Sequence, residues 1–269
     1  MDTKPSEPCT RLIVMLPCGD ESAFKWIEQN RSTPLGKYDD PDWKGVPVSA
    51  VLPSTFDRYV KILHRLDARY DNIDHPLSPD EIAIVGIPEC SRLRNLVESH
   101  RGSESTRIRW KSVADALGLA FESGITDDWF RAVIEAGCWP RLIYGPDDGW
   151  LNGEEASALL QVLGRATVAE AIYLRMAEIP LIVTEIPLLY EGCFEDVVTL
   201  LRSEQTSMQP EYWWPPDRAW CVCSDYDLTF TMVGASDEVC QELLEDKALE
   251  CIEVKPETRV DFRSPPRLL

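Results

Sequence analysis

Residues 212–234 carry the side chains of this chain that are best suited to chemistry or recognition. Three of the nine tryptophans, two of the nine cysteines and three aspartates fall within this one segment. Asp225 and Asp227 flank Tyr226, and their carboxylates could bind a divalent cation or act as an acid/base pair. The alternative is turn chemistry, because aspartate side chains hydrogen-bond the local backbone in tight turns. The Asp-x-Asp-x-Asp-Gly run of a calcium loop is not present.

A second pair of charged residues, Asp217 and Arg218, lies between two prolines and Trp220. An arginine in this setting can anchor an anion or a protein partner, with neighbouring tryptophans as stacking surfaces. In the structural alternative, Arg218 pairs with a carboxylate, packs its planar head on a tryptophan and fixes the chain before the next strand. The candidate partner-binding residues are therefore Trp213, Trp214, Asp217, Arg218, Asp225 and Asp227.

The cysteines give a weaker signal. Cys221 and Cys223 share one side of a predicted strand and Cys240 follows, but Cys-x-Cys without a second well-spaced pair is a poor zinc motif. We expect these thiols to be buried apolar residues, and we predict no metal and no cofactor. The chain has nine cysteines and no Cys-x-x-Cys pair, which is typical of a reducing compartment.

A catalytic alternative starts from His64. With Asp217, Arg218, Asp225 and Asp227 it could form a hydrolase-type site, if the fold brought these residues into one pocket. The sequence contains no nucleophile elbow, Walker loop, dinucleotide fingerprint or zincin helix. The missing motifs favour a role without catalysis.

Charge restricts the class of partner. The chain has 46 acidic and 27 basic residues, which gives a formal net charge of −19 at pH 7. Such a field repels nucleic-acid phosphates and anionic membranes, and it favours basic proteins or cations. We find no signal peptide, and no apolar run approaches the length of a membrane span. The sequence therefore predicts a soluble cytoplasmic protein with a basic protein partner.

The elements that position these residues begin with a hairpin. The apolar runs at 219–223 and 228–233 are separated by Ser224-Asp225-Tyr226-Asp227, which predicts two antiparallel strands joined at the aspartates. A helix is expected from Ser54, because apolar residues from Phe56 to Leu66 recur at helical spacing. Further helices are expected at 20–29, 110–117, 127–136, from Asn152, at 193–201 and from Ser236, and further strands at 11–16, 171–176, 181–186 and 251–254.

These elements predict an α+β fold. A mainly helical N-terminal region is followed by an antiparallel or mixed sheet with helices, in the order strand pair, helix, hairpin, helix, strand. The linker-like residues 100–106 divide the chain into regions 1–105 and 106–255, or the two form one continuous domain. A loose tail is expected at 256–269.

The tryptophan-rich segment also contains a distinctive motif. It reads Tyr212-Trp213-Trp214-Pro215-Pro216-Asp217-Arg218-Ala219-Trp220, and Asp225-Tyr226-Asp227 and Val233-Gly234 follow. This pattern resembles the C-terminal region of a family of uncharacterised bacterial proteins, common in actinobacteria, in which W-P-x-D-R-x-W precedes a strand, an acidic turn and Val-Gly-Gly. Here Ala235 stands at the second glycine. The resemblance implies kinship but no activity or catalytic residues, because the family has no established function.

Two functions remain open. The first is a non-catalytic, acidic protein-binding module, such as an immunity-type or inhibitory protein or a subunit of a bacterial defence or regulatory assembly. It predicts acidic residues clustered beside exposed tryptophans. The second is a hydrolase-type enzyme with an Asp/Arg/His site, and it predicts that these groups converge in a pocket.

Overall fold

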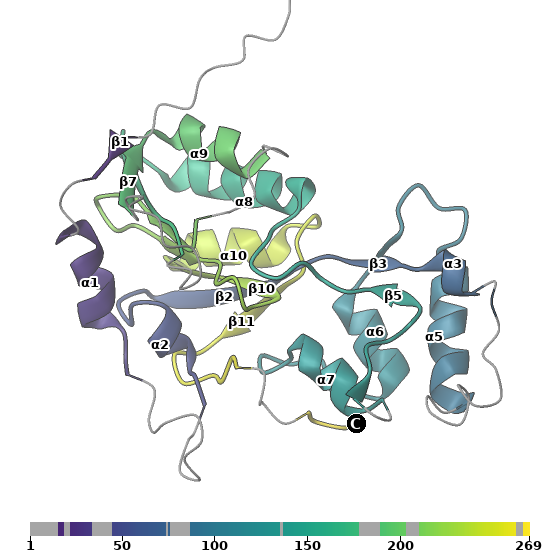
Figure 1. The fold of residues 1–269 in the computed structure, drawn as a ribbon. Coiled ribbons are helices and arrows are strands. Elements are labelled where there is room, and N and C mark those ends of the chain that lie inside the picture. The colour runs from purple at the N-terminus through teal and green to yellow at the C-terminus, as the bar shows by residue number, and fades with distance from the viewer. Residues whose placement is uncertain are drawn as a thin grey trace, which may run out of the picture.

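A large antiparallel sheet organises the fold (Figure 1). The computed structural model describes residues 16–18, 22–33, 45–73, 75, 87–134, 137–177, 189–202, 210–261 and 266–269. In order across the sheet, the eight strands are β1 (Leu16–Pro17), β7 (Leu189–Gly192), β6 (Ile172–Arg175), β8 (Tyr212–Trp214), β9 (Cys221–Cys223), β10 (Phe230–Ala235), β2 (Arg58–Leu63) and β11 (Cys251–Val254). The predicted α+β class is confirmed, and every pairing in this sheet is antiparallel.

A smaller lobe lies beside the large sheet. It holds a three-stranded sheet in the order β4 (Arg107–Ile108), β3 (Leu66–Ala68) and β5 (Ile143–Tyr144). The described helices that accompany it are α3 (Tyr70–Ile73), α5 (Ile87–Ser99), α6 (Trp110–Leu117) and α7 (Asp127–Ala132). The chain enters this lobe directly from β2, since β3 begins three residues after β2 ends.

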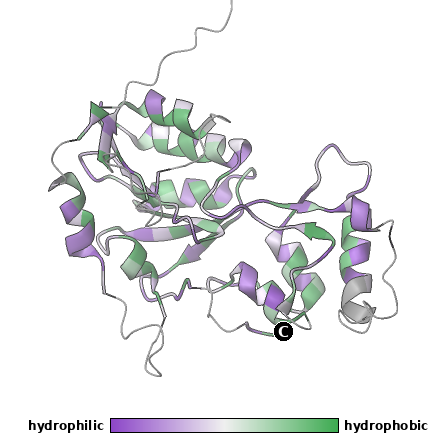
Figure 2. Ribbon diagram, in the orientation of Figure 1, coloured by the Kyte–Doolittle hydropathy of each residue, from purple (hydrophilic) through white to green (hydrophobic). Residues whose placement is uncertain are grey.

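Helices cover both faces of the large sheet. The helices α8 (Gly153–Ala166), α9 (Phe194–Arg202) and α10 (Asp237–Glu245) pack on one face. The helices α1 (Ser22–Asn30) and α2 (Val48–Val51), together with the smaller lobe, pack on the other. Figure 2 shows hydrophobic and hydrophilic residues sharing the covering helices, as expected when one side of a helix faces a sheet and the other meets solvent. Because helices cover both faces, strands in the middle of the sheet are buried on both sides.

The predicted helix from Ser54 is wrong, because residues 58–63 form β2 between β10 and β11. Along β2, Tyr59 and Leu63 face one core while Val60 and Ile62 face the other. A strand that is buried on both faces is apolar throughout, so its residues also satisfy a helical pattern of positions i, i+3, i+4 and i+7. The N-terminal region is accordingly less helical than predicted.

Other predicted elements are confirmed. The helix α6 ends at Gly118, whose φ of 73° is the left-handed conformation that glycine adopts readily. Asn152 caps α8 in a complete capping box with Glu155, and the Ser236 side chain caps α10. The strands β9, β10 and β11 form at the predicted hairpin and at 251–254. The predicted strand at 181–186 and most of the one at 11–16 lie outside the described residues.

The large sheet takes strands from both predicted regions, since β1 pairs with β7 and β2 lies between β10 and β11. Part of the predicted loose tail is packed: Val260 is buried, and its N–H donates to the carbonyl of Val46 at 2.9 Å. The region boundaries at 105 and 255 stay predictions. None of the helices described here has the length and apolar character that crossing a bilayer would need.

Candidate functional site

The two tryptophans predicted to bind a partner lie inside the protein. Trp213 and Trp214 are neighbours on β8, so they point to opposite faces of the sheet, and each is only 1% exposed. The Trp213 ring meets the Trp220 ring edge-on at 5.2 Å, whereas Trp214 lies 5.9 Å from the Phe24 ring in the opposite core. Neither ring offers a surface to a partner, because each is enclosed by its core.

Asp217 and Arg218 lie in the exposed connection between β8 and β9. The Arg218 guanidinium lies 5.0 Å from the Trp26 ring, so it packs on a tryptophan from α1. Arg218 has a φ of 60°, and its N–H donates to the carbonyl of Pro215 at 2.9 Å. A carboxylate oxygen of Asp217 accepts the N–H of Ala219 at 3.1 Å. These contacts shape the connection, in agreement with the structural alternative for Arg218.

Asp225 and Asp227 form the turn between β9 and β10. Asp225 Oδ1 accepts the N–H of Asp227 at 2.9 Å, and the Asp225 carbonyl accepts the N–H of Leu228 at 3.0 Å. This is the turn chemistry expected of aspartate. Because β8, β9 and β10 are successive antiparallel strands, this turn and the Arg218 connection lie at opposite ends of β9. The fold therefore does not bring the two charged pairs together.

His64 is buried beneath this turn and takes part in a chain of hydrogen bonds. His64 Nδ1 lies 2.7 Å from the carbonyl oxygen of Asp147, and Nε2 lies 3.0 Å from Thr231 Oγ1, which is 2.7 Å from Ser224 Oγ. A carbonyl only accepts, so Nδ1 carries the proton and Nε2 accepts from Thr231. Burial lowers the pKa of His64 to about 4, so the ring is neutral near pH 7. His64 joins the loop at Asp147 to strand β10 and is enclosed, which does not fit the predicted catalytic role.

Three segments bring six aspartates to one place, which we call the aspartate cluster. The N–H of Gly149 donates to the carbonyl of Leu228 at 2.7 Å, which joins the loop before α8 to the hairpin turn. Thr229 Oγ1 donates to Asp127 Oδ1 at 3.1 Å, which joins the start of α7 to the same turn. The members of the cluster are Asp127, Asp128, Asp147, Asp148, Asp225 and Asp227.

The aspartates of this cluster repel one another. Burial, and then the charges of Asp127 and Asp227, raise the pKa of Asp148. Burial is also the main cause of the raised pKa of Asp225, and Asp227 adds to it. Among the residues that the structure describes, the base in contact with these carboxylates is Arg131, which lies 3.5 Å from Asp127 and 3.7 Å from Asp128. One guanidinium leaves an excess of negative charge, which favours the approach of cations.

Sequence reasoning found the turn but missed the rest of this cluster. Asp127 and Asp128 were expected only as a helix start, and they do lie in the first turn of α7. Asp147 and Asp148 lie in a loop that has no helical or strand pattern of its own. The available signal was the two Asp-Asp pairs, one of them before a glycine. Only the tertiary fold places them beside the hairpin turn.

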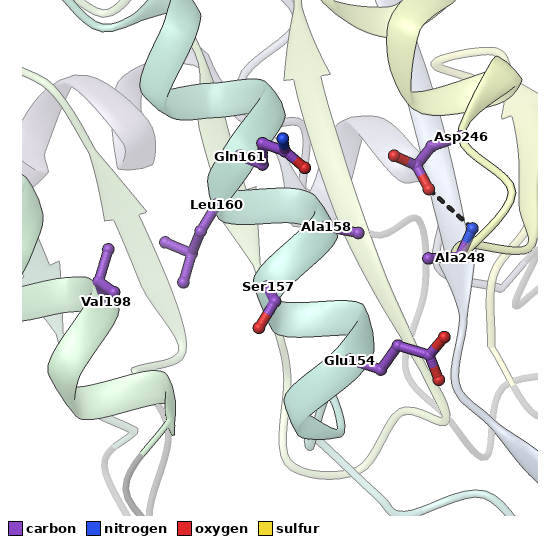
Figure 3. A pocket seen from close by; sticks show the side chains of 8 residues that line it. All are labelled: Glu154, Ser157, Ala158, Leu160, Gln161, Val198, Asp246 and Ala248. Atoms are coloured by element: carbon purple, nitrogen blue, oxygen red, sulfur yellow. Dashed lines mark hydrogen bonds between the residues drawn. The ribbon is translucent and has the colours of Figure 1, made fainter.

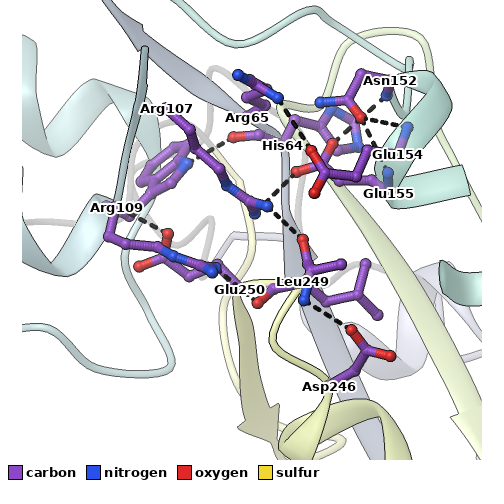
Figure 4. A network of polar contacts seen from close by, with 12 residues as sticks. His64, Arg65, Arg107, Arg109, Asn152, Glu154, Glu155, Asp246, Leu249 and Glu250 are labelled. Carbon is purple, nitrogen blue, oxygen red and sulfur yellow. Dashed lines mark hydrogen bonds and ion pairs between the residues drawn. The ribbon is translucent and has the colours of Figure 1, made fainter. Parts of the chain in front are cut away.

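A buried polar network, shown in Figure 4, joins the smaller lobe to the large sheet. Arg107 Nη2 lies 3.4 Å from Glu155 Oε1 on α8, and both side chains are almost completely buried. Burial raises the pKa of Glu155 to about 7, against the opposing effect of Arg107. Glu250 accepts the N–H groups of Trp110 and Lys111 at 2.9 and 3.0 Å, which satisfies the start of α6. Each charged side chain labelled in Figure 4 has a partner within the protein, so this network holds the lobes in place.

Cys221, Cys223 and Cys240 do not lie at one common site. Cys221 and Cys223 belong to the core beneath α1 and α2, and Cys240 belongs to the core beneath α8, so the sheet separates them. All three are buried, as expected, and burial raises the pKa of each thiol. Among the described residues, no group of three or more His, Cys, Asp or Glu side chains is arranged to hold a metal ion.

Comparisons with protein-family models, with curated proteins and with solved structures found no match to this chain. The resemblance of the tryptophan-rich segment to an actinobacterial family therefore stays a prediction. The function that we propose is therefore argued from the geometry of the aspartate cluster.

Proposed function

We propose that this protein is a non-catalytic binding module that engages a basic protein through the aspartate cluster. The observation that carries the proposal is the convergence of six aspartates from three segments, with Arg131 as the opposing base among the contacts of the described residues. A surface of this kind attracts lysine- and arginine-rich partners and raises their association rate. Nucleic acids and anionic membranes are unfavourable partners for the same reason.

The shape of the cluster supports recognition as well as attraction. Tyr226 stands between Asp225 and Asp227 and is 46% exposed, so its ring is available beside the carboxylates. An aromatic ring next to acidic groups can hold a lysine or arginine side chain through cation–π contact and ion pairing. The turn beneath it is fixed by the hydrogen bonds of Asp225, Gly149 and Thr229. A fixed turn lowers the entropy cost of binding.

The biological setting that fits this proposal is neutralisation or regulation of a basic protein. An immunity-type or inhibitory protein, or an acidic subunit of a bacterial defence or regulatory assembly, would use such a surface. The hydrolase-type alternative loses its support, because His64 is enclosed and the pairs Asp217–Arg218 and Asp225–Asp227 lie at opposite ends of β9.

Affinity capture with matched charge variants tests the proposal. The test variant carries Asp148→Asn, Asp225→Asn and Asp227→Asn, since asparagine can still accept the hydrogen bond that forms the turn. The control variant carries Glu28→Gln, Glu98→Gln and Glu104→Gln, three exposed acids on other elements, and changes the net charge equally.

We expect the wild-type and control proteins to capture the same basic protein at low salt and to lose it at high salt. The test variant should not retain it at either salt concentration. Equal capture by both variants would show that net charge, and not the aspartate cluster, retains the protein, and would contradict the proposal.

A further inference from the structure

The carboxyl group of Glu155 is buried where the smaller lobe meets α8 (Figure 4). Glu155 lies in the first turn of α8, and Arg107 reaches it from β4 of the smaller lobe. The Glu155 side chain is 0% exposed and the Arg107 side chain 9%. Two opposite charges therefore meet across the boundary between the two parts of the fold, away from solvent. We call this Arg107–Glu155 contact the lobe junction.

The contacts that compensate the Glu155 charge are long. Among the described residues, its Oε1 lies 3.4 Å from Arg107 Nη2, and its Oε2 accepts the N–H of Asn152 at 3.4 Å. Charge-assisted hydrogen bonds to a carboxylate are usually about 2.7–2.9 Å long. Glu250 in the same network shows the difference, because it accepts two backbone N–H groups at 2.9 and 3.0 Å. The charge of Glu155 is therefore buried with incomplete compensation.

The arginines nearest to this carboxyl group are engaged by other partners. Arg107 also donates to the carbonyl oxygen of Ala248. Arg65 lies 2.9 Å from a carboxylate oxygen of Asp67 and 3.1 Å from one of Glu154. Neither guanidinium can turn fully toward the buried carboxylate without giving up a bond that it already makes.

Burial dominates the proton affinity of Glu155. It raises the pKa of Glu155 to about 7, and the charges of Arg107 and Arg65 oppose this rise without cancelling it. Burial also raises the pKa of Glu250 and of the Cys251 thiol beside the junction. The charged and titratable groups that surround Arg107 and Glu155 are Arg65, Asp67, Arg109, Glu154, Asp246, Glu250 and Cys251.

The protonation of Glu155 is linked to closure of the junction. A junction open to solvent returns Glu155 to its ordinary pKa of 4.5, whereas the closed junction holds the pKa near 7. The closed form therefore binds more protons between these values, and its stability falls as the pH rises from about 4.5 to about 7.

We infer that the lobe junction is a proton-linked latch, which holds the smaller lobe on α8 most tightly when Glu155 is protonated and loosens as the carboxylate forms. Neither Arg107 nor Glu155 belongs to the aspartate cluster. The latch and the proposed binding function can therefore fail separately.

Hydrogen exchange followed by mass spectrometry tests the latch on the complete protein. Rates at about pH 6 and about pH 8 are divided by those of unstructured peptides, so that the ratio reports opening of the structure. Peptides from β4 and from the first turns of α8 report on the junction, and peptides from the hairpin of β9 and β10 are the internal reference.

The test variant is Glu155→Gln, which keeps a side-chain acceptor for the N–H of Asn152 but cannot titrate. Glu154→Gln is its matched control, since Glu154 is the adjacent carboxylate on α8. Figure 3 shows Glu154 lining an open depression on the surface of α8, where its side chain is 57% exposed.

We expect opening of the junction to increase about tenfold from pH 6 to pH 8 in the wild type and in Glu154→Gln, and not in Glu155→Gln. The reference peptides should show no such increase in any of the three proteins. An increase of the same size in Glu155→Gln, or wild-type opening that does not change with pH, would overturn the latch.

A second variant covers a failure of Glu155→Gln to fold. Arg107→Gln removes the charge that opposes the rise in the Glu155 pKa, so the pH midpoint of junction opening should lie higher than in the wild type. An unchanged midpoint would show that Glu155 does not control the junction.

Discussion

Lys61 lies on the central strand β2 and is completely buried. Its Nζ donates to the carbonyl oxygens of Ser123 and Ile125 at 2.7 and 2.5 Å and lies 4.9 Å from the Phe230 ring. These contacts tie the connection between α6 and α7 to the large sheet. Carbonyl oxygens and a ring satisfy the amine without supplying the full negative charge of a carboxylate. Burial therefore lowers the pKa of Lys61 to about 7.

This burial predicts a pH dependence of stability. The unfolded chain keeps the Lys61 proton up to a pKa near 10.5, whereas the folded protein releases it near 7, so the unfolded state binds more protons between these values. The Lys61 contribution to the free energy of unfolding should rise with pH across that range, and it should be lowest below pH 7. Replacement by methionine, Lys61→Met, should remove this rise.

Urea denaturation of the wild-type and Lys61→Met proteins, at pH values from below 7 upward, measures this effect. The difference between the two proteins isolates Lys61 from buried thiols such as Cys221, whose raised pKa opposes stability at alkaline pH. A difference that does not change with pH would mean that Lys61 is not buried in the folded protein.

Gly149 controls the position of the hairpin turn. Its φ is 62°, and a Cβ atom there would lie 2.6 Å from the Cα of Tyr226. We expect Gly149→Ala to destabilise the protein by roughly 1–3 kcal/mol through backbone strain and this contact. Gly102→Ala is the matched control, because Gly102 also has a positive φ but has no atom within 4 Å of an added Cβ. Thermal unfolding of both variants measures the difference, and equal losses would show that the Tyr226 contact is unimportant.

At the scale of elements, the hairpin places one tryptophan in the core and one arginine on the surface. Trp220 is fully buried and its Nε1 donates to Thr167 Oγ1 at 3.0 Å, so Trp220→Ala should cost roughly 3–5 kcal/mol of unfolding free energy. Arg218 is exposed, and its guanidinium packs on Trp26. The Arg218→Ala substitution removes this contact, so it should lower the free energy of unfolding by about 1 kcal/mol or less. Urea unfolding of both variants measures the two losses of unfolding free energy. Equal losses would show that Arg218 stabilises the core as much as Trp220 does.

Elements with local signals could be predicted from the sequence. Asn152, Ser236 and Gly118 mark helix ends through their own side chains or backbone freedom, and the structure confirms all three. The strand β2 could not be predicted, because its burial on both faces depends on β10 and β11, more than 160 residues later in the chain. Its single internal cation, Lys61, also gave the run an amphipathic appearance. Hydrophobic periodicity alone cannot distinguish a short strand buried on both faces from an amphipathic helix.

The molecule as a whole has a net charge of −19 and two hydrophobic cores, one on each side of the large sheet. The sequence predicted the acidic character and the aspartate turn. It could not predict that the loop before α8 and the start of α7 reach the same turn, since those contacts join residues far apart in the chain. It also could not predict which tryptophans are enclosed. For this reason the function that we propose uses the aspartate cluster and not the tryptophans as the binding surface.

The aspartate cluster is tested most sharply by the affinity of the captured basic protein for three forms of the chain, measured by calorimetry at two salt concentrations. We predict that the Asp148→Asn, Asp225→Asn, Asp227→Asn variant binds at least about tenfold more weakly than the wild type. The Glu28→Gln, Glu98→Gln, Glu104→Gln variant should bind nearly as the wild type does, and its affinity should keep the wild-type dependence on salt. Equal affinities of the two variants would contradict the aspartate cluster as the binding surface.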